Sequence, residues 1–198
     1  MRMSSAVDYD EKAFNSRIPI QRYWQRKRFK YITEFSKGHI VLDLGCGSSR
    51  IIQKLQEEGR GIGLDFSYNK LHYLKNKVEG MYVCGNVQKL GFKDESVDCV
   101  IYSNVIEHIN SPKDSIAEIT RVLKEGGCLI LATPDYGSKS WRLIEKVYDL
   151  IKLGNSYKKE HISPLTLAQI YKLIQGYVIK DVVKIFGSEV IIKCRKGG

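Results

Sequence analysis

The stretch VLDLGCGSSR, residues 41–50, decides the fold, because an apolar run stops there at two closely spaced glycines. A continuous apolar run such as 39–44 is typical of a strand that is buried on both faces of a parallel sheet. Gly45 and Gly47 allow the backbone to turn tightly and to approach a ligand without a Cβ in the way. Residues 48–59 then have the apolar spacing of a helix and end on a glycine. A strand, a glycine loop and a helix in this order are typical of a nucleotide site.

Strand and helix signals continue to alternate beyond this loop. Further strands are predicted at 61–66, 81–85, 96–104 and 128–134, and helices at 67–78 (with Ser67 as N-cap) and 111–127. After Pro134, helices are predicted at 139–153 and 164–175, and two strands at 177–186 and 189–195, joined across Gly187–Ser188. This order predicts an α/β fold: a Rossmann-like sheet of seven mostly parallel strands, with helices on both faces and a C-terminal antiparallel hairpin. Ligands of such sheets bind at the carboxyl ends of the strands.

The net charge of +10 is concentrated at the two ends of the chain. Residues 1–39 carry nine Lys and Arg against four Asp and Glu, and 139–198 carry twelve against five. Residues 40–138 carry eleven against thirteen. Two interpretations stay open: an anionic partner that meets the basic flanks, or a basic surface that serves solubility alone.

The remaining bulk features predict one compact cytoplasmic protein. The five cysteines form no CxxC pair, which favours buried free thiols in a reducing cytoplasm, and no zinc-type spacing is present, so we expect no metal site. No apolar stretch is long enough to span a membrane, and the first fourteen residues contain no apolar signal core.

The glycine loop excludes several cofactors by the residues that it lacks. A dinucleotide loop has the pattern G-x-G-x-x-G, and its third glycine would fall at position 50, where this chain has Arg50. A long side chain there would obstruct the packing of helix on strand and the approach of a pyrophosphate. The G-x-x-x-x-G-K-[ST] pattern of phosphate-binding loops is missing as well. NAD, FAD and nucleoside triphosphates are therefore disfavoured.

Four sequence blocks carry a resemblance to a known family. They are VLDLGCGSS (41–49), GIGLDFS (61–67), GNVQKLGFKDESVDCVIYSNVIEHI (85–109) and RVLKEGGCLILATPD (121–135). In this order they resemble the class I S-adenosylmethionine (SAM)-dependent methyltransferases, of the small type related to ubiquinone and menaquinone biosynthesis methyltransferases. The resemblance implies SAM as the cofactor. It also implies a helical lead-in over 1–38 that forms part of a cap on the methyl acceptor, and a methyltransferase domain over 39–198.

The resemblance also implies which residues contact the cofactor. They are Asp43, Gly45, Cys46, Gly47, Asp65, Phe66, Asn86, Val87 and Ser103. Asp43 would organise the loop and the amino group of the methionine end, and Asp65 would accept hydrogen bonds from the ribose hydroxyls. Asn86 departs from the usual Asp and keeps a carbonyl acceptor for the adenine amino group, while Val87 would offer its backbone N–H to the adenine ring. Ser49 replaces the usual third glycine and is tolerated if its φ is negative.

Two histidines are candidates for the catalytic machinery. His108 follows the fourth predicted strand and matches the histidine of the family's LEH-type stretch, and His161 resembles a histidine that precedes a late helix in many relatives. Each could contact the acceptor or act as a general base. The alternative stays open that His108 only orders its loop.

The sequence limits the class of the methyl acceptor but does not identify the acceptor itself. The basic, aromatic segment 18–35 and the amphipathic segment 140–154 would border the acceptor pocket, the latter as a packed lid or as an interfacial helix. We expect a small-molecule acceptor, anionic or linked to a lipid or glycan, with possible peripheral contact to an anionic membrane. RNA methylation, with the basic flanks on phosphates, and a non-catalytic SAM-binding protein are the alternatives. The proline motif of DNA amino-methyltransferases and the exposed cysteine of cytosine-C5 enzymes are missing.

Overall fold

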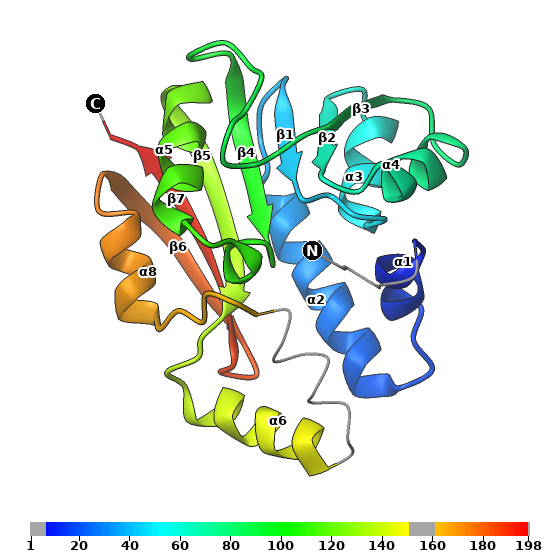
Figure 1. Cartoon of the computed structure of the whole chain (residues 1–198), viewed down its shortest axis with the longest axis vertical. Coiled ribbons are helices and arrows are strands. Elements are labelled where there is room, and N and C mark those ends of the chain that lie inside the picture. Colours follow the sequence, from blue (N-terminus) through cyan, green and yellow to red (C-terminus); the bar gives the residue numbers. More distant parts are fainter. Residues whose placement is uncertain (1–6, 151–160, 198) are drawn as a thin grey trace.

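A seven-stranded sheet forms the centre of the protein, in the strand order β3-β2-β1-β4-β5-β7-β6 (Figure 1). The computed structural model describes residues 7–150 and 161–197. The strands are β1 (Val41–Leu44), β2 (Gly61–Asp65), β3 (Met81–Cys84), β4 (Val97–Ser103), β5 (Leu123–Pro134), β6 (Tyr177–Ile185) and β7 (Glu189–Lys196). Strands β1 to β5 are parallel, and β7 enters between β5 and β6 antiparallel to both. The predicted mostly parallel sheet with a C-terminal antiparallel hairpin is confirmed.

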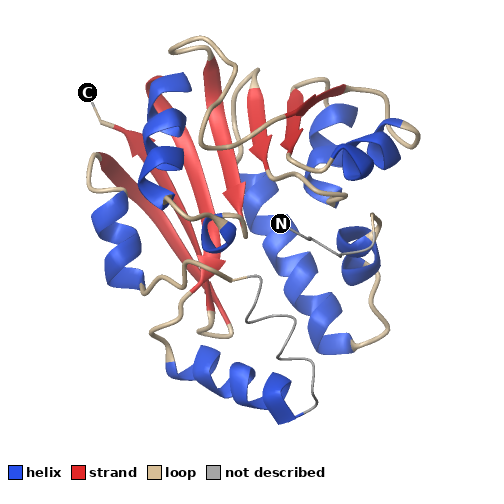
Figure 2. Cartoon of the chain, in the orientation of Figure 1, coloured by secondary structure: helices blue, strands red, loops and turns tan. Residues whose placement is uncertain are grey.

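Helices cover both faces of this sheet (Figure 2). They are α1 (Tyr9–Phe14), α2 (Pro19–Phe35), α3 (Arg50–Glu57), α4 (Tyr68–Lys75), α5 (Pro112–Val122), α6 (Lys139–Leu150) and α8 (Leu167–Leu173), with a short 3-10 helix η1 (Ile106–His108). Side chains alternate along β4: Val100 and Tyr102 join the core under α5 and α8, while Cys99 and Ile101 join the core under α2, α3 and α4. Burial on both faces explains why the central strands β1 and β4 are largely apolar. The edge strands β3 and β6 are mostly exposed.

The predicted helix at 111–127 is too long, and the strand after it begins earlier than 128. Helix α5 ends at Val122, and β5 begins at Leu123, which is extended (φ −70°, ψ 131°) and fully buried. Leu123 pairs with Val97, and the next pair is Cys128 with Cys99, so residues 124–127 bulge opposite a single residue of β4. Gly126, at φ +67°, therefore shapes a β-bulge and not the end of a helix.

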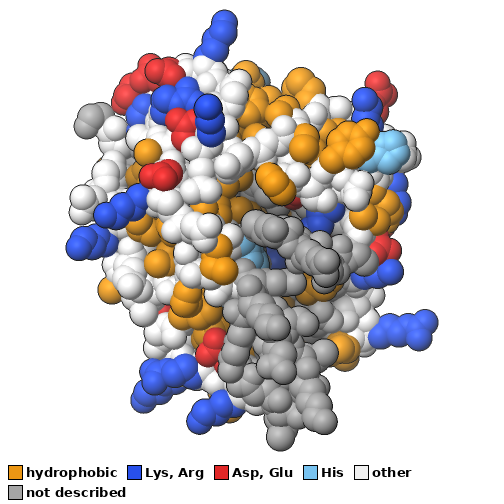
Figure 3. Space-filling view, in the orientation of Figure 1, with side chains coloured by type: hydrophobic (Ala, Val, Ile, Leu, Met, Phe, Trp, Pro, Cys, Tyr) orange, Lys and Arg blue, Asp and Glu red, His pale blue; other side chains and the backbone are white. Residues whose placement is uncertain are grey.

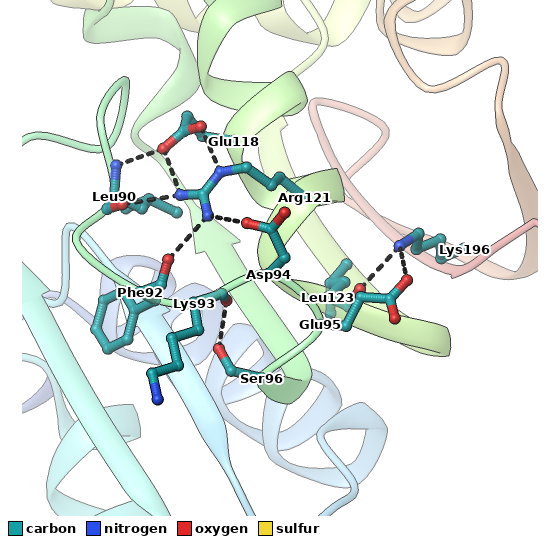
Figure 4. Close-up of polar contacts among 10 residues, drawn as sticks. All are labelled: Leu90, Phe92, Lys93, Asp94, Glu95, Ser96, Glu118, Arg121, Leu123 and Lys196. Carbon is teal, nitrogen blue, oxygen red and sulfur yellow. Dashed lines mark hydrogen bonds and ion pairs between the residues drawn. The ribbon is translucent and has the colours of Figure 1, made fainter.

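The loop between β3 and β4 is fixed to α5 by one arginine (Figure 4). The Arg121 guanidinium pairs with Glu118 at 2.8 Å and with Asp94 at 2.6 Å. It also donates to the carbonyl oxygens of Leu90 (2.9 Å) and Phe92 (2.8 Å). These bonds satisfy backbone groups that no strand could pair, and they hold in place the segment that follows the predicted adenine-binding residues.

Two predictions from composition can be compared with the structure. All five cysteines are free, and three of them (Cys46, Cys99 and Cys194) are buried. Among the described residues, none of the helices combines the length and the apolar character that crossing a bilayer requires.

The parallel strands all end at one edge of the sheet, and this edge places the site. The arrowheads of β1, β2 and β4 point toward it, and α1, α2 and η1 lie near it (Figure 1). The loops that follow Leu44, Leu64 and Tyr102 therefore converge there, as the sequence predicts.

Candidate functional site

The glycine loop after β1 has a backbone that only glycine adopts comfortably. Gly45 and Gly47 have φ values of +66° and +52°. A Cβ on Gly45 would lie 2.4 Å from a methyl carbon of Val105, and one on Gly47 would lie 2.4 Å from a carboxylate oxygen of Asp10. Between them, Cys46 points into the core, where burial raises the pKa of its thiol. The loop thus presents backbone and no side chains at the edge of the sheet.

Ser49 begins the helix that follows the loop. Its φ is −71°, and its hydroxyl accepts a hydrogen bond from the backbone N–H of Ile52 at 3.4 Å. Ser49 is therefore the N-cap of α3, a position where serine is among the preferred residues. The condition that the sequence sets for Ser49, a negative φ, is met, and Arg50 is the exposed first residue of the helix.

Asp65, at the end of β2, joins two loops. One of its carboxylate oxygens accepts the backbone N–H of Gly47 at 2.8 Å, and the other accepts that of Ser67 at 2.8 Å. Its side chain is buried. Carboxylate oxygens accept more than one hydrogen bond each, so these contacts leave acceptor capacity for a ligand. The assignment of Asp65 to the ribose stays a prediction.

Asp43, in the middle of β1, is a buried acid whose charge is poorly compensated. Only 3 % of its surface is exposed, and within the described part of the chain its Oδ2 atom has no hydrogen-bond partner. Burial, followed by the nearby charges of Asp65 and Asp10, raises the pKa of this carboxyl well above its usual range. An unpaired buried carboxylate is unfavourable, and a cationic ligand group would relieve it.

Asp10 contacts the glycine loop, and the sequence does not reveal this contact. It lies in α1, yet its carboxylate accepts from the backbone N–H of Ser48 at 3.0 Å and from the Ser48 hydroxyl at 3.2 Å. Its own backbone N–H donates to that hydroxyl at 3.3 Å. Thirty-eight residues separate the partners, so no local pattern could have indicated the contact. With Asp43 and Asp65, Asp10 makes the glycine loop acidic in a protein of net charge +10.

The residues predicted to contact adenine lie at the ends of β2 and β3. Phe66 is 68 % exposed, so its ring is accessible beside Asp65. The side-chain oxygen of Asn86 accepts from the backbone N–H of Gln88 at 2.9 Å, and Val87 packs partly against the core. The Asn86 carbonyl is thus oriented by a local turn. Ser103, the last predicted cofactor contact, ends β4 and is half-buried.

A cluster of one carboxylate and two histidines lies beyond β4. Glu107 and His108 come from η1, His161 comes from the segment before α8, and their potential ligand atoms all lie within 4.8 Å of one another. The two imidazole rings meet at right angles with centroids 4.7 Å apart. Glu107 is buried and accepts from the Thr133 hydroxyl at 3.2 Å, and the Tyr136 hydroxyl is hydrogen-bonded to Nδ1 of His161. The sequence singles out both histidines but not Glu107.

Burial shifts the pKa values of two groups of this cluster in opposite directions. It raises the pKa of the Glu107 carboxyl to about 7. Burial, assisted by the nearby His108, lowers the pKa of His161 to about 4. Both shifts favour the neutral form, as expected for ionisable groups removed from water.

A buried ion pair connects α2 to the start of β7. Arg28 meets Glu189, the first residue of β7, at 2.6 Å, and the indole N–H of Trp24 donates to the same carboxylate. In the orientation that satisfies its hydrogen bonds, the Asn104 side chain donates to Glu189 at 3.3 Å and accepts from Arg28 at 2.9 Å. The sequence places Arg28 in the basic segment 18–35 and leaves open whether the basic flanks meet an anionic partner or serve solubility alone. In the structure its side chain is only 17 % exposed and paired.

The family comparison agrees with this geometry. Residues 42–131, from β1 to β5, match the family model of a methyltransferase domain. The chain is 28 % identical over 201 residues to the ubiquinone biosynthesis O-methyltransferase of Salmonella typhi, with 88 % of this chain and 81 % of that protein covered. Together these matches support the assignment of the chain to the class I SAM-dependent methyltransferases.

Two further proteins resemble this methyltransferase. An uncharacterized 37.1 kDa protein in transposon TN4556 of Streptomyces fradiae is 31 % identical over 109 residues, which cover 51 % of this chain. The match spans about a third (32 %) of that protein's own length. Among solved structures, a SAM-dependent methyltransferase of Thermotoga maritima, described as a possible histamine N-methyltransferase, has a TM-score of 0.76 at 19 % identity, covering 96 % of both chains. That likeness shows the shared fold.

The loop of this methyltransferase fits its cofactor, SAM, in two respects. Gly45 and Gly47 carry no side chain and have positive φ values, so the loop backbone can lie close to the methionine end, while Val105 and Asp10 occupy the space where a Cβ would be. The unpartnered Oδ2 of Asp43, in the strand that leads into the loop and near the charges of Asp65 and Asp10, suits the positively charged amino group and sulfonium of SAM. An ammonium group would supply the hydrogen bond and the charge that this carboxylate lacks.

Proposed function

We propose that the protein transfers the methyl group of SAM to a hydroxyl oxygen of a small, anionic acceptor, free or linked to a lipid or glycan. The observation that carries this proposal is the position of the Glu107–His108–His161 cluster. Val105, which packs against Gly45 of the cofactor loop, comes two residues before Glu107. Glu107 and His108 thus follow closely on a residue that contacts the glycine loop, which would place proton-accepting atoms near the methionine end of the cofactor. The name of the Salmonella relative, an O-methyltransferase, supports oxygen as the acceptor atom.

When bound, SAM supplies a methyl group on positively charged sulfur: an acceptor lone pair forms the new bond to carbon while the carbon–sulfur electron pair returns to sulfur, giving S-adenosylhomocysteine. The protein's own residues bind and orient. Asp43 would hold the cationic amino group of the cofactor and Asp65 its ribose hydroxyls, and the glycine loop would let the backbone lie close to the methionine end. Such alignment supplies roughly 7–11 kcal/mol of barrier reduction in favourable cases. The cluster stabilises loss of the proton that an acceptor hydroxyl must release.

The charge of the protein supports an anionic acceptor. Helix α2 carries the exposed Arg26 and Lys30, and α6 carries the exposed Lys139, Arg142 and Lys146. On the face that Figure 3 shows, the Lys and Arg side chains of the described residues lie around the rim and form no continuous stripe. A nucleic-acid backbone is usually followed by such a stripe. We therefore favour a small anionic group over RNA.

A thermal-shift experiment tests the cofactor assignment. S-adenosylhomocysteine raises the melting temperature of the full chain, because a ligand that binds only the folded state stabilises it. Asp65→Ala abolishes the shift, and NAD gives none with either protein. Glu79→Ala, an exposed acid on the loop before β3, is the matched control and keeps the shift. Absence of a shift in the unaltered protein would contradict SAM as the cofactor.

A labelling experiment identifies the acceptor class. The protein is incubated with methyl-labelled SAM and a cell extract that is separated into lipid, RNA, protein and small-molecule fractions. Label in the small-molecule or lipid fraction, absent with the Asp65→Ala protein, supports the proposal. Label in RNA would replace it with RNA methylation. Binding of S-adenosylhomocysteine without label in any fraction would indicate a SAM-binding protein without catalysis.

A further inference from the structure

We propose that Glu107, His108 and His161 bind a divalent transition-metal cation of the zinc class, with one coordination position left for the methyl acceptor. Their potential ligand atoms already lie within 4.8 Å of one another. Zinc holds nitrogen and oxygen ligands at about 2.0–2.2 Å, so two ligands of a tetrahedral site lie roughly 3.4 Å apart. The cluster is therefore at most roughly 1.4 Å from a ligating arrangement, a change that side-chain rotation supplies.

The donor set selects the kind of cation. Two imidazoles and one carboxylate suit zinc, cobalt, nickel or ferrous iron, whereas magnesium and calcium prefer oxygen ligands throughout. Two histidines and one glutamate also form a common three-residue set of catalytic zinc sites, in which the fourth position is taken by water or substrate.

The charge around Glu107 supports a cation at this place. The side chain is 1 % exposed, and its one side-chain hydrogen bond within the described residues comes from the neutral Thr133 hydroxyl at 3.2 Å. No ion pair involves Glu107 in the described ranges, since the nearby Arg28 is paired with Glu189. Buried carboxylates are usually paired with a cation or coordinate a metal. A divalent ion would compensate this charge.

The surroundings of His161 fit the same interpretation. Metal-bound histidines usually hydrogen-bond an oxygen atom through the ring nitrogen that does not face the metal, and this bond fixes the ring and its tautomer. The Tyr136 hydroxyl is such an oxygen at Nδ1 of His161, which assigns Nε2 as the ligand atom. Tyr136 follows the end of β5, so the sheet itself positions the second histidine.

A cation here would act on the acceptor, and this role rests on the proposed function. A hydroxyl bound at the open position loses its proton to solvent more readily, because a zinc-class ion lowers the pKa of a bound oxygen by several units. The oxygen lone pair then forms the bond to the methyl carbon, as described above. The ion would also fix the acceptor next to the cofactor loop, which reaches the cluster through Val105 and Gly45.

The test uses the full chain without a histidine tag, stripped of metal by a chelator and titrated with Co²⁺, with Zn²⁺ as competitor. We expect one Co²⁺ per chain, with visible absorption that Zn²⁺ removes. His161→Gln and Glu107→Gln weaken binding by about 10- to 100-fold or more, since they remove ligands. His39→Gln, an exposed histidine remote from the cluster in sequence, binds like the unaltered protein. The shift by S-adenosylhomocysteine, retained in each variant, shows that the protein is folded.

The outcomes separate the metal site from the proposed function. The metal site is overturned if the unaltered protein binds S-adenosylhomocysteine but no Co²⁺, or if His161→Gln binds Co²⁺ equally well. It is also overturned if a sulfur-to-cobalt absorption band appears and is lost in Cys84→Ser, because the ion then sits on the exposed thiol. Intact Co²⁺ binding without methylation of any extract fraction would support the metal site and overturn the proposed function.

Discussion

The cofactor side and the acceptor side of the site are built by different means. On the cofactor side, the shape comes from the backbone: two glycines at positive φ, a serine N-cap and a carboxylate that accepts backbone N–H groups. On the acceptor side, buried side chains from separate elements hold one another, such as Arg28 of α2 with Glu189 of β7. The cofactor side therefore needs particular residue types at a few adjacent positions, whereas the acceptor side depends on pairs of residues that lie far apart in the sequence.

This difference predicts that the two sides respond differently to substitution. A backbone-built loop keeps its shape as long as its glycines and cap are kept. A site that is built from paired side chains changes its shape and charge whenever one residue of a pair is replaced. We therefore expect substitutions on the two sides to differ in how much they change the free energy of unfolding and how much they change the affinity for the ligand.

The largest expected effect is on the acceptor side. Arg28→Ala leaves Glu189 buried without its charge partner, and breaking such a pair destabilises a protein by about 3–5 kcal/mol. Unfolding in urea, followed by circular dichroism, measures the loss. Arg26→Ala, on the same helix but exposed, is the control and costs less than about 1 kcal/mol. Equal losses in the two variants would show that the pair does not hold the acceptor side together.

A substitution on the cofactor side should separate stability from binding. Asp43→Asn removes a poorly paired buried charge, so the protein without ligand gains stability while its affinity for S-adenosylhomocysteine falls by about tenfold or more. Burial raises the pKa of Asp43 in the folded state, so the native carboxyl loses stability as the pH rises toward that folded pKa. The gain from Asn is therefore larger at pH 8 than at pH 5. Melting curves at both pH values, with and without ligand, measure it, and a gain that falls with pH would contradict this account.

The smallest expected effect comes from the helix cap. Ser49→Ala removes the hydroxyl that accepts the Ile52 N–H and costs about 1 kcal/mol of stability, while Ser49→Gly costs only a few tenths. Affinity for S-adenosylhomocysteine stays within about twofold in both variants, since the positive-φ glycines are unchanged. Isothermal titration and urea unfolding together check this pair. A large loss of affinity in Ser49→Ala would mean that the hydroxyl, and not only the backbone, serves the cofactor.

The fold could be predicted where the signals are local. Apolar runs, the glycine loop and the turns from 39 to 135 indicated the sheet and its parallel strands, and the late hairpin followed from its own alternation. The boundary between α5 and β5 was wrong because Gly126 and Gly127 resemble the end of a helix. Their actual place in a bulge depends on the pairing of Leu123 with Val97, which the sequence alone does not reveal.

The site could be predicted only in part for the same reason. The positive φ of Gly45 and Gly47 follows from their residue type, and His108 and His161 were found through the resemblance to relatives. Glu107 was not predicted, because a single acid beside a histidine in the sequence does not indicate a site. Only the fold shows that Glu107 is buried within a cluster with two histidines. The ion pair of Arg28 could not be predicted, because nothing near it in the sequence indicates Glu189.

The contact of Asp10 with Ser48 bears on where the functional unit begins. The family match starts at residue 42, after α1 and α2, so a minimal domain cut at its boundaries would contain both glycines of the loop. It would lack the carboxylate of Asp10 that holds Ser48 from outside, and it would lack both partners of the Arg28–Glu189 pair. Transplanting residues 42–131 into another protein would therefore carry over the glycine loop but leave behind contacts that hold it and its surroundings in place.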